Sequence, residues 1–306
     1  MSYYYKVFGL SLESPIFCPE LLVDESGAAP EIVIRFGEVP QELESPVDSG
    51  ARWQTSPGLF LLNLKRVGRF LVRAGSEIVI QPVDPISEDN IRTFLLSSCL
   101  SILLHQRKMF ALHVSGIHTE RGAVLFAGHS GAGKSTVVSA FLQRGYKMLS
   151  DDMLAITFDE NNRLHVLPGF PQVKLWADSA EALGRSTDGL RRVLQQYDKF
   201  AAPTYDNFDP QPTTLHAIYL LSQHNSPQFI LESLGQTKRF NGLLDNTWQK
   251  LTLVGLGLRE WHFMTAAKIA SQVYIASLTR PQQPFRLTEM ADLIEADFKR
   301  DLQPLI

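Results

Sequence analysis

The sequence has little of what marks an exported or metal-bound protein. Cysteine occurs twice in 306 residues, as Cys18 and Cys99. Two cysteines so far apart form neither a disulfide framework nor the spacing of a zinc site, and they suit a reducing compartment. The segment Met1–Lys6 has neither the basic start nor the apolar stretch of a signal peptide. We therefore expect a cytoplasmic protein.

Long hydrophobic runs and an excess of charge are missing as well. The most apolar segment, 91–104, is interrupted by Arg92 and several serines and is shorter than the ~20 residues that cross a bilayer. We expect a core helix over 89–107 and no membrane partner. The formal charge of -3 and the pI of about 6.2 give no electrostatic argument for a nucleic-acid partner.

The order of elements indicates two regions. Residues 1–85 read as a β-rich N-terminal region, with a polar connection over 40–57. Its expected strands are 31–36, 59–64, 69–73 and 77–80. Residues 86–306 alternate strands and helices, which predicts an α/β domain whose last part is helical. Its expected strands are 112–117, 123–127, 148–152, 154–158 and 217–221, and its expected helices are 136–144, 239–248, 261–278 and 287–302.

A phosphate-binding loop is the most informative motif. Residues 128–136, GHSGAGKST, match the Walker A pattern G-x-x-x-x-G-K-[ST] between an apolar strand and a helix. Glycines let backbone N–H groups approach phosphate, Lys134 reaches the outer phosphates, and the Ser135 hydroxyl suits Mg²⁺. We expect ATP with Mg²⁺ to bind here. The predicted nucleotide-binding residues are Gly128, His129, Ser130, Gly131, Ala132, Gly133, Lys134, Ser135 and Thr136.

Asp151 and Asp152 follow the next apolar strand. Phosphoryl transfer needs a carboxylate that orders Mg²⁺ and, in a kinase, another that accepts a proton from the attacking hydroxyl. Adjacent residues on a strand point to opposite faces, so the two carboxylates should divide these roles.

The segment 126–156 resembles the catalytic core of bacterial HPr kinase/phosphorylase and its relatives, which combine G-x-S-G-x-G-K-S with R-G-x-x-x-x-x-D-D. The resemblance implies a P-loop kinase core of the HPr kinase/PEP carboxykinase type with a mixed sheet. It further implies that Asp152 accepts the proton of a serine hydroxyl and that Asp151 lies on the metal side. His113, fifteen residues before Gly128, occupies the place of the family's histidine near the γ-phosphate.

One segment departs from that family. Where HPr kinases carry E-x-R-G-L-G, this chain has PGFPQVKLW over 168–176, so the family's metal-binding glutamate has no counterpart. This segment and the Arg239–Asn241 stretch resemble a divergent group of HPr-kinase-like proteins. That group includes kinases of lasso-peptide biosynthesis, which phosphorylate a serine of a precursor peptide. Kinase activity without efficient phosphorolysis is expected, and oligomeric HPr kinases suggest a homo-oligomer by analogy.

We expect Lys174 and Arg239 to contact phosphate or substrate, because they belong to the resembling segments and phosphoryl transfer usually needs a further cation. Three classes of function stay open: a kinase, an ATPase switch and a binding module. We prefer an ATP-dependent kinase of a serine in a peptide or protein, with Asp152, His113 and Lys134 as catalytic residues. The acceptor could instead be a small hydroxyl metabolite such as free serine. An ATPase switch and a peptide-binding module are the remaining alternatives.

Overall fold

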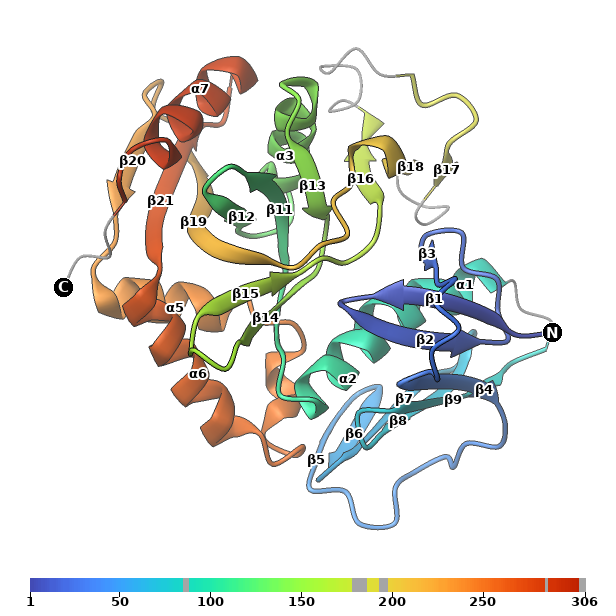
Figure 1. Ribbon diagram of the computed structural model, residues 1–306. Helices are drawn as coiled ribbons and strands as arrows, with labels where there is room; N and C mark the ends of the chain where they lie inside the picture. Colours follow the sequence, from blue (N-terminus) through green and yellow to red (C-terminus); the bar gives the residue numbers. More distant parts are fainter. Residues whose placement is uncertain (85–87, 178–185, 193–197, 284–285, 303–306) are drawn as a thin grey trace. The chain divides into compact units, whose positions relative to one another are not determined.

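The computed structural model describes residues 1–84, 88–177, 186–192, 198–283 and 286–302 (Figure 1). The chain divides into two compact units, one formed by Met1–Ala111 with Thr247–Thr265 and the other by Leu112–Asn246 with Ala266–Ile306. The sequence led us to place the helix near residue 88 and the segment 247–265 in the second domain. The division differs at that helix because its C-terminal part packs against strand β8 of the first unit.

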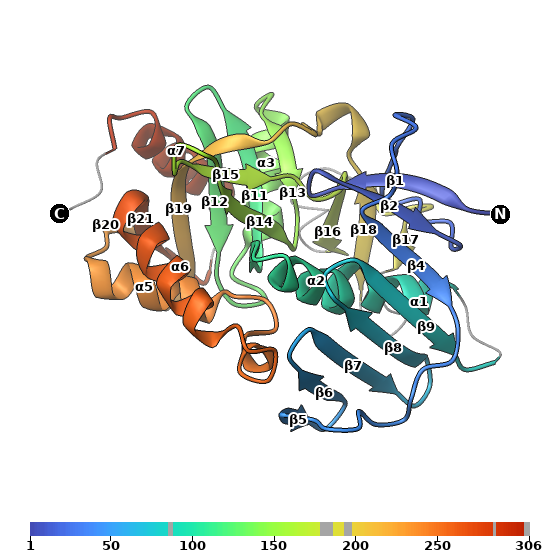
Figure 2. The ribbon, with the colours of Figure 1, turned by 60° about the horizontal axis from the view of Figure 1, so that its bottom comes forward.

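The first unit is built on one mixed sheet with the strand order β3-β1-β2-β4-β9-β8-β7-β6-β5. Its strands are β1 (Tyr3–Val7), β2 (Leu10–Ser14), β3 (Leu22–Val23), β4 (Ile32–Phe36), β5 (Asp48–Gly50), β6 (Trp53–Ser56), β7 (Leu59–Leu64), β8 (Gly68–Arg73) and β9 (Glu77–Pro82). Strand β4 runs parallel to β2 and β9, and the other pairs are antiparallel. Figure 2 shows β5 to β9 side by side.

The four strands expected in this region are confirmed as β4, β7, β8 and β9. The expectation of an irregular connection over 40–57 is wrong in part, because β5 and β6 form a hairpin there. Polar residues hide that hairpin from a hydrophobicity pattern, since Thr55 is the one fully buried residue of β6. Strands β1 and β2 were not predicted.

The expected core helix is confirmed as one helical segment. It consists of α1 (Glu88–Phe94), the π-helical turn η1 (Leu95–Cys99) and α2 (Leu100–Gln106). Helix α2 packs against β8, and the Gln106 side chain donates to the carbonyl oxygens of Gly58 and Val72. From their residue types we expect Pro85 and Ser87 to belong to the start of this helix, but both lie outside the described residues. Within the described ranges no helix combines the length and apolarity that crossing a bilayer requires.

The second unit is a mixed α/β structure. Its strands are β11 (Val114–Thr119), β12 (Gly122–Ala127), β13 (Lys147–Ser150), β14 (Leu154–Phe158), β15 (Leu164–Leu167), β16 (Gln172–Trp176), β17 (Arg191–Arg192), β18 (Lys199–Pro203), β19 (Thr213–His224), β20 (Ile230–Ser233) and β21 (Tyr274–Pro281). The large sheet contains the order β14-β15-β19-β12-β11-β13, with β21 beside β19 and β20 beside β21. Strands β16, β18 and β17 form a separate small sheet.

The directions of the central strands bring distant residues to one edge of the large sheet. Strands β12, β19 and β21 are mutually parallel, while β11 is antiparallel to both β12 and β13. The carboxyl ends of β12, β13, β19 and β21 and the beginning of β11 therefore lie at the same edge. Ligands of α/β sheets commonly bind outside the carboxyl ends of parallel strands.

Helices cover this sheet and fix its strands. Helix α3 (Lys134–Gln143) contacts β11 and α7 (Leu287–Phe298), and the rings of Phe126 and Phe141 stack with centroids 5.7 Å apart. The other helices are α5 (Gln236–Asp245) and α6 (Arg259–Gln272), with the short turns η2 (Tyr205–Asn207) and η3 (Lys250–Leu253) and strand β10 (Phe110–Leu112). The helix expected over 261–278 is wrong beyond residue 272, because 274–281 pairs with β19 as β21. Tertiary pairing overrides the local pattern there.

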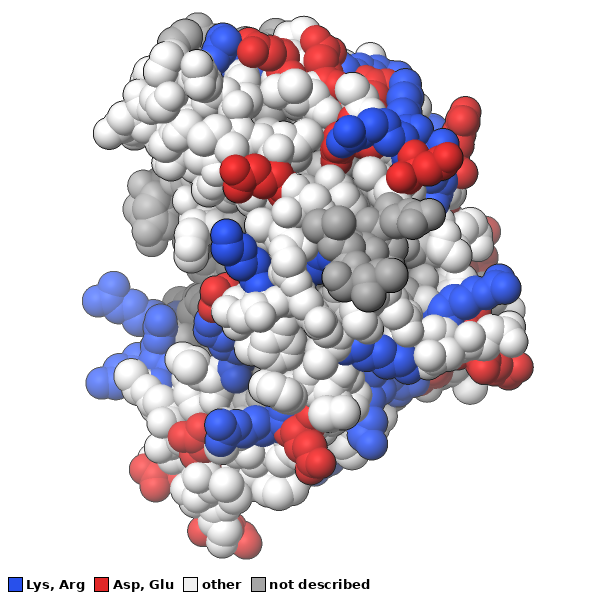
Figure 3. Space-filling view, turned by 90° about the vertical axis from the view of Figure 1, so that its left-hand side faces the viewer, with Lys and Arg blue, Asp and Glu red and all other residues white. Residues whose placement is uncertain are grey.

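Charges of both signs are interspersed on the face shown in Figure 3, over the residues that are coloured there. This mixture agrees with the small net charge of -3.

Candidate functional site

A cavity of about 400 Å³ in the second unit gathers most of the predicted site residues at the edge just described. The loop after β12 lines one wall with Ser130, Gly131, Gly133, Lys134, Ser135 and Thr136. His113, the two aspartates, Lys174 and Trp176 line another, and Gln223 and Arg280 come from the ends of β19 and β21. Gly128, His129 and Ala132 belong to the loop but are not among the lining residues.

The loop has the backbone geometry that its glycines predict. Gly128, Gly131 and Gly133 have φ values of 139°, 85° and 106°. Residues other than glycine rarely adopt this region of φ. A Cβ atom at Gly128 would lie 2.5 Å from the carbonyl oxygen of Leu221, so the close approach of two strands also requires glycine there. Helix α3 begins directly after Gly133, and its N-terminus borders the cavity.

Lys134, His113 and Asp152 form a connected row. The Lys134 Nζ lies 3.2 Å from Nε2 of His113 and donates to the Gly128 carbonyl oxygen at 2.8 Å. On the other side of the imidazole, Nδ1 lies 3.3 Å from Oδ1 of Asp152 and 2.9 Å from its backbone oxygen. Burial lowers the pKa of His113; Asp152 opposes this shift and Lys134 reinforces it. A neutral imidazole is therefore favoured, with Nδ1–H donating to Asp152 and Nε2 accepting from Lys134.

Asp151 is buried and accepts three hydrogen bonds. Its Oδ1 accepts from the hydroxyls of Ser115 and Ser135, the latter at 2.9 Å, and its Oδ2 accepts from the backbone N–H of Lys174 at 2.7 Å. A carboxylate held in this way is fixed in one orientation. This carboxylate thus contacts the hydroxyl of Ser135, the other residue for which the sequence predicts a metal role.

Asp152 has an unusual backbone conformation. Its φ of 98° is strained for a residue with a side chain, and such strain is concentrated at functional sites. The Nζ of Lys174 lies 2.8 Å from its Oδ2. Both aspartates line the cavity, but their side chains have different partners. Asp151 accepts from Ser115, Ser135 and the Lys174 backbone, whereas Asp152 contacts His113 and the Lys174 ammonium. The strand expected over 148–152 ends at Ser150, so the two aspartates lie in a bend after β13 and strand alternation does not apply to them. That they divide their roles stays a prediction.

Two residues that no sequence pattern singles out support the loop. The side chain of Asn246 accepts from the Gly128 N–H at 2.8 Å, and its backbone oxygen accepts from the His113 N–H at 2.7 Å. Arg280 is buried, and its guanidinium donates from Nε to the Ala132 carbonyl at 3.2 Å. Burial lowers the pKa of Arg280. Neither residue belongs to a recognisable motif, so only the fold identifies them.

Arg239 does not lie in this cavity. It is almost fully buried in α5, and its Nε donates to the Leu234 carbonyl oxygen at 2.6 Å. This expected phosphate contact is corrected to a packing role, because the guanidinium satisfies backbone oxygens inside the unit. Lys174, the other expected contact, does line the cavity.

The donor set fits Mg-ATP. Positive-φ glycines, a helix N-terminus and a lysine suit a phosphate chain. Among the described residues no cluster of three or more His, Cys, Asp and Glu could hold a metal by itself. A hydroxyl and one carboxylate are nevertheless what Mg²⁺ uses when substrate phosphates and water complete its coordination. Ser135 and Asp151 are the residues that would hold it.

Comparison with known proteins gave little. No family model matches the chain, and no curated protein matches it. Among solved structures, the chain is similar to an HPr(Ser) kinase/phosphatase from Coxiella burnetii. The similarity covers 61% of this chain and 89% of that chain, with 13% sequence identity and a TM-score of 0.32. A similarity with so low an identity and TM-score assigns no activity to this chain.

Proposed function

We propose that the protein is an ATP-dependent phosphotransferase that transfers the γ-phosphoryl group to a serine hydroxyl of a peptide or protein. The observation that carries the proposal is the row Lys134–His113–Asp152, which joins the loop lysine to a strained carboxylate within one cavity. A cation for phosphate and a carboxylate for a hydroxyl proton are the two groups that kinase chemistry needs side by side.

Each residue of the row has a chemical role in this proposal. Backbone N–H groups of the loop and the ammonium of Lys134 bind the phosphates of ATP and oppose the negative charge of the transition state. Asp152 accepts the proton of the attacking serine hydroxyl. His113 donates to Asp152 and accepts from Lys134, so it holds both groups in place.

Asp151 positions rather than reacts. Asp151 is 1% exposed and accepts hydrogen bonds from Ser115, Ser135 and the backbone of Lys174, whereas 20% of the Asp152 side chain is exposed. Asp152 is therefore the carboxylate that a substrate hydroxyl can reach. When bound, Mg²⁺ would neutralise phosphate charge, and Asp151 would orient the Ser135 hydroxyl toward it. We prefer a serine in a peptide to a free hydroxyl metabolite as the acceptor, because the segment 168–176 resembles lasso-peptide kinases. We also propose a cytoplasmic location and a homo-oligomer.

Substitution of Asp152 tests the assignment. Purified protein is incubated with ATP, Mg²⁺ and serine-containing peptides, and intact mass reports the gain of one phosphoryl group. Asp152→Asn should lower this transfer by about a hundredfold or more while ATP still binds. ATP hydrolysis that does not depend on any acceptor would favour the ATPase switch. Phosphorylation of free serine but of no peptide would favour the metabolite kinase, and peptide binding without turnover would favour the binding module.

A further inference from the structure

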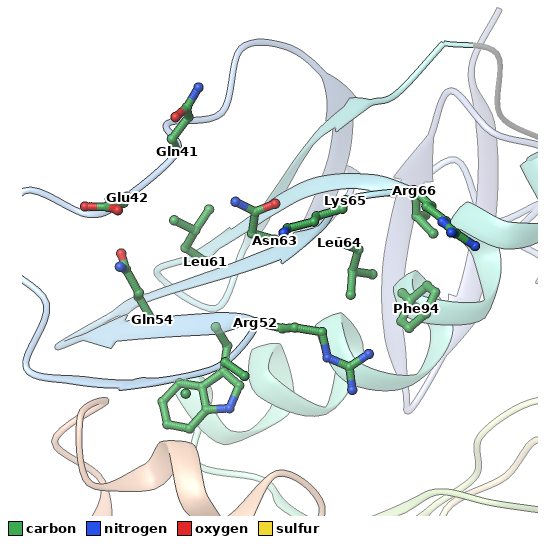
Figure 4. A pocket seen from close by; sticks show the side chains of 14 residues that line it. Gln41, Glu42, Arg52, Gln54, Leu61, Asn63, Leu64, Lys65, Arg66 and Phe94 are labelled. Atoms are coloured by element: carbon green, nitrogen blue, oxygen red, sulfur yellow. The ribbon is translucent and has the colours of Figure 1, made fainter.

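The first unit contains a cavity of about 620 Å³ that the proposed phosphotransfer does not use. Figure 4 shows it at the β6 and β7 end of the sheet, with Gln41 and Glu42 on a loop to one side and Phe94 from α1 at the other. Buried Leu61 and Leu64 contribute to its walls. Its size lies within the range of about 300–1,000 Å³ that pockets for small molecules occupy, so it can hold a few side chains of a peptide.

Three cations line this cavity without internal partners. Arg52, Lys65 and Arg66 are exposed, and no described residue forms an ion pair or a side-chain hydrogen bond with any of them. Glu42 is the single carboxylate in the lining, so the cavity carries two net positive charges in a protein of net charge -3. The lining therefore complements an anionic ligand.

A second cavity, in the other unit, shows that lysine and arginine at a cavity wall do not by themselves indicate an anionic ligand. It too has a volume of about 620 Å³ and several cations. There, however, Arg121 binds Asp301, Arg144 binds Asp292 and Glu295, and Lys299 binds Glu295. Its positive charge is matched by the protein's own carboxylates, and it makes no comparable case for a ligand.

The wall that carries Gln41 and Glu42 is held in place before any ligand binds. The loop is anchored on both sides, since Val39 N–H donates to Oε1 of Gln81 at 2.8 Å and Leu43 N–H donates to Oε1 of Gln54 at 2.7 Å. Val39 and Leu43 also pack with Leu61 in a buried cluster. A preformed cavity loses less entropy on binding than a loop that must first order.

We propose that this cavity binds an acidic peptide segment in which carboxylates alternate with apolar side chains. Arg52, Lys65 and Arg66 would pair with the carboxylates, while Trp53 and Phe94 would contact the apolar residues. The Asn63 amide offers both a donor and an acceptor to a peptide backbone. Nucleic acid fits the cavity less well, because affinity for it grows with the number of phosphates that are neutralised, and this lining has three cations.

Binding is tested with the full-length protein and a fluorescein-labelled heptapeptide of alternating Asp or Glu and Leu or Phe. Fluorescence anisotropy should show binding that weakens with added salt and is lost when the acidic residues are replaced by Asn and Gln. The triple variant Arg52→Gln, Lys65→Gln, Arg66→Gln should raise the Kd by about tenfold or more. Arg259→Gln, which removes an exposed arginine outside the cavity, is the matched control and should leave the Kd unchanged.

A second readout does not depend on the charge variants. Peptide addition should change the tryptophan fluorescence, and Trp53→Phe should remove that change. Absence of peptide binding, equal binding by the triple variant, or binding of single-stranded DNA in place of peptide through the same cations would each overturn the proposal. Binding is measured without ATP and repeated with Asp152→Asn, so its failure is distinct from failure of the phosphotransfer.

Discussion

The ammonium of Lys174 lies 2.8 Å from Oδ2 of Asp152, while the backbone N–H of the same lysine donates to Asp151. One residue of β16 therefore fixes both carboxylates that follow β13. This strand belongs to the segment 168–176. It places the Lys174 ammonium against the carboxylate that we propose as the proton acceptor.

Lys174→Met should lower kcat for phosphotransfer by about tenfold to a hundredfold with little change in ATP affinity. The reason is that the proton acceptor loses its orientation, whereas the loop that binds phosphate is untouched. Steady-state kinetics and nucleotide titration measure the two effects. Lys299→Met, which breaks an exposed ion pair with Glu295, is the control. Equal loss in both variants, or a loss of ATP binding alone, would contradict a role for Lys174 at Asp152.

The backbone of Asp152 predicts an inverted order of stability. Both Asp152→Gly and Asp152→Ala remove the carboxylate, but only glycine adopts a φ of 98° without strain. The glycine variant should therefore be the more stable by about 1 kcal/mol in urea unfolding. At Asp292, inside α7, the order should be the usual one, with alanine more stable than glycine by about 1 kcal/mol. The same order at both positions would show that Asp152 is not strained.

The sequence predicts those parts of the site whose residues are close together in the chain. The loop and the aspartate pair could be found because their residues are contiguous and their chemistry dictates their types. His113 was found only through a family resemblance, and Ser115 two residues later was missed although it hydrogen-bonds Asp151. Hydroxyls are too common in a sequence to be selected without the fold.

Asn246 and Arg280 show the limit more clearly. Each lies more than a hundred residues from the loop that it supports, and strand pairing and helix packing alone bring them there. The error at Arg239 has the converse origin, since a cation in a resembling segment turned out to be buried among backbone carbonyls. The two-unit division could not be read from composition, because residues 247–265 return to the first unit late in the chain.

Acid should destabilise the protein through two histidines of the first unit. Burial lowers the pKa of both His105 and His262 to about 4. Between pH 6.5 and 4 these two histidines bind more protons in the unfolded chain than in the folded one. Their contribution to the free energy of unfolding therefore falls as the pH falls through this window, and it is constant above the window. Each histidine accounts for at most about 3 kcal/mol.

Urea unfolding as a function of pH measures this effect. His105→Gln keeps a donor for the Trp248 carbonyl oxygen, which His105 Nε2 now contacts at 2.9 Å, and should reduce the slope between pH 6.5 and 4. His224→Gln, a change in the other unit, is the control. An unchanged slope in the His105 variant would show that this histidine does not set the acid limit.

Two glycines of the loop allow stability and ligand binding to be separated. At Gly128 a methyl group would meet the Leu221 carbonyl oxygen at 2.5 Å, and a backbone atom cannot move away cheaply. Gly128→Ala should lower the free energy of unfolding by more than about 2 kcal/mol. At Gly131 the methyl group would have no neighbour within 4 Å, so only the strain of φ 85° remains, about 1 kcal/mol.

Gly131, unlike Gly128, lines the cavity. Gly131→Ala should therefore weaken ATP binding in a protein that remains folded, whereas the weaker binding of Gly128→Ala should accompany a loss of stability. Urea unfolding and nucleotide titration on the same samples compare the two. If Gly131→Ala bound ATP as well as the unchanged protein does, the triphosphate would not pass over this part of the loop, and the kinase proposal would lose its donor site.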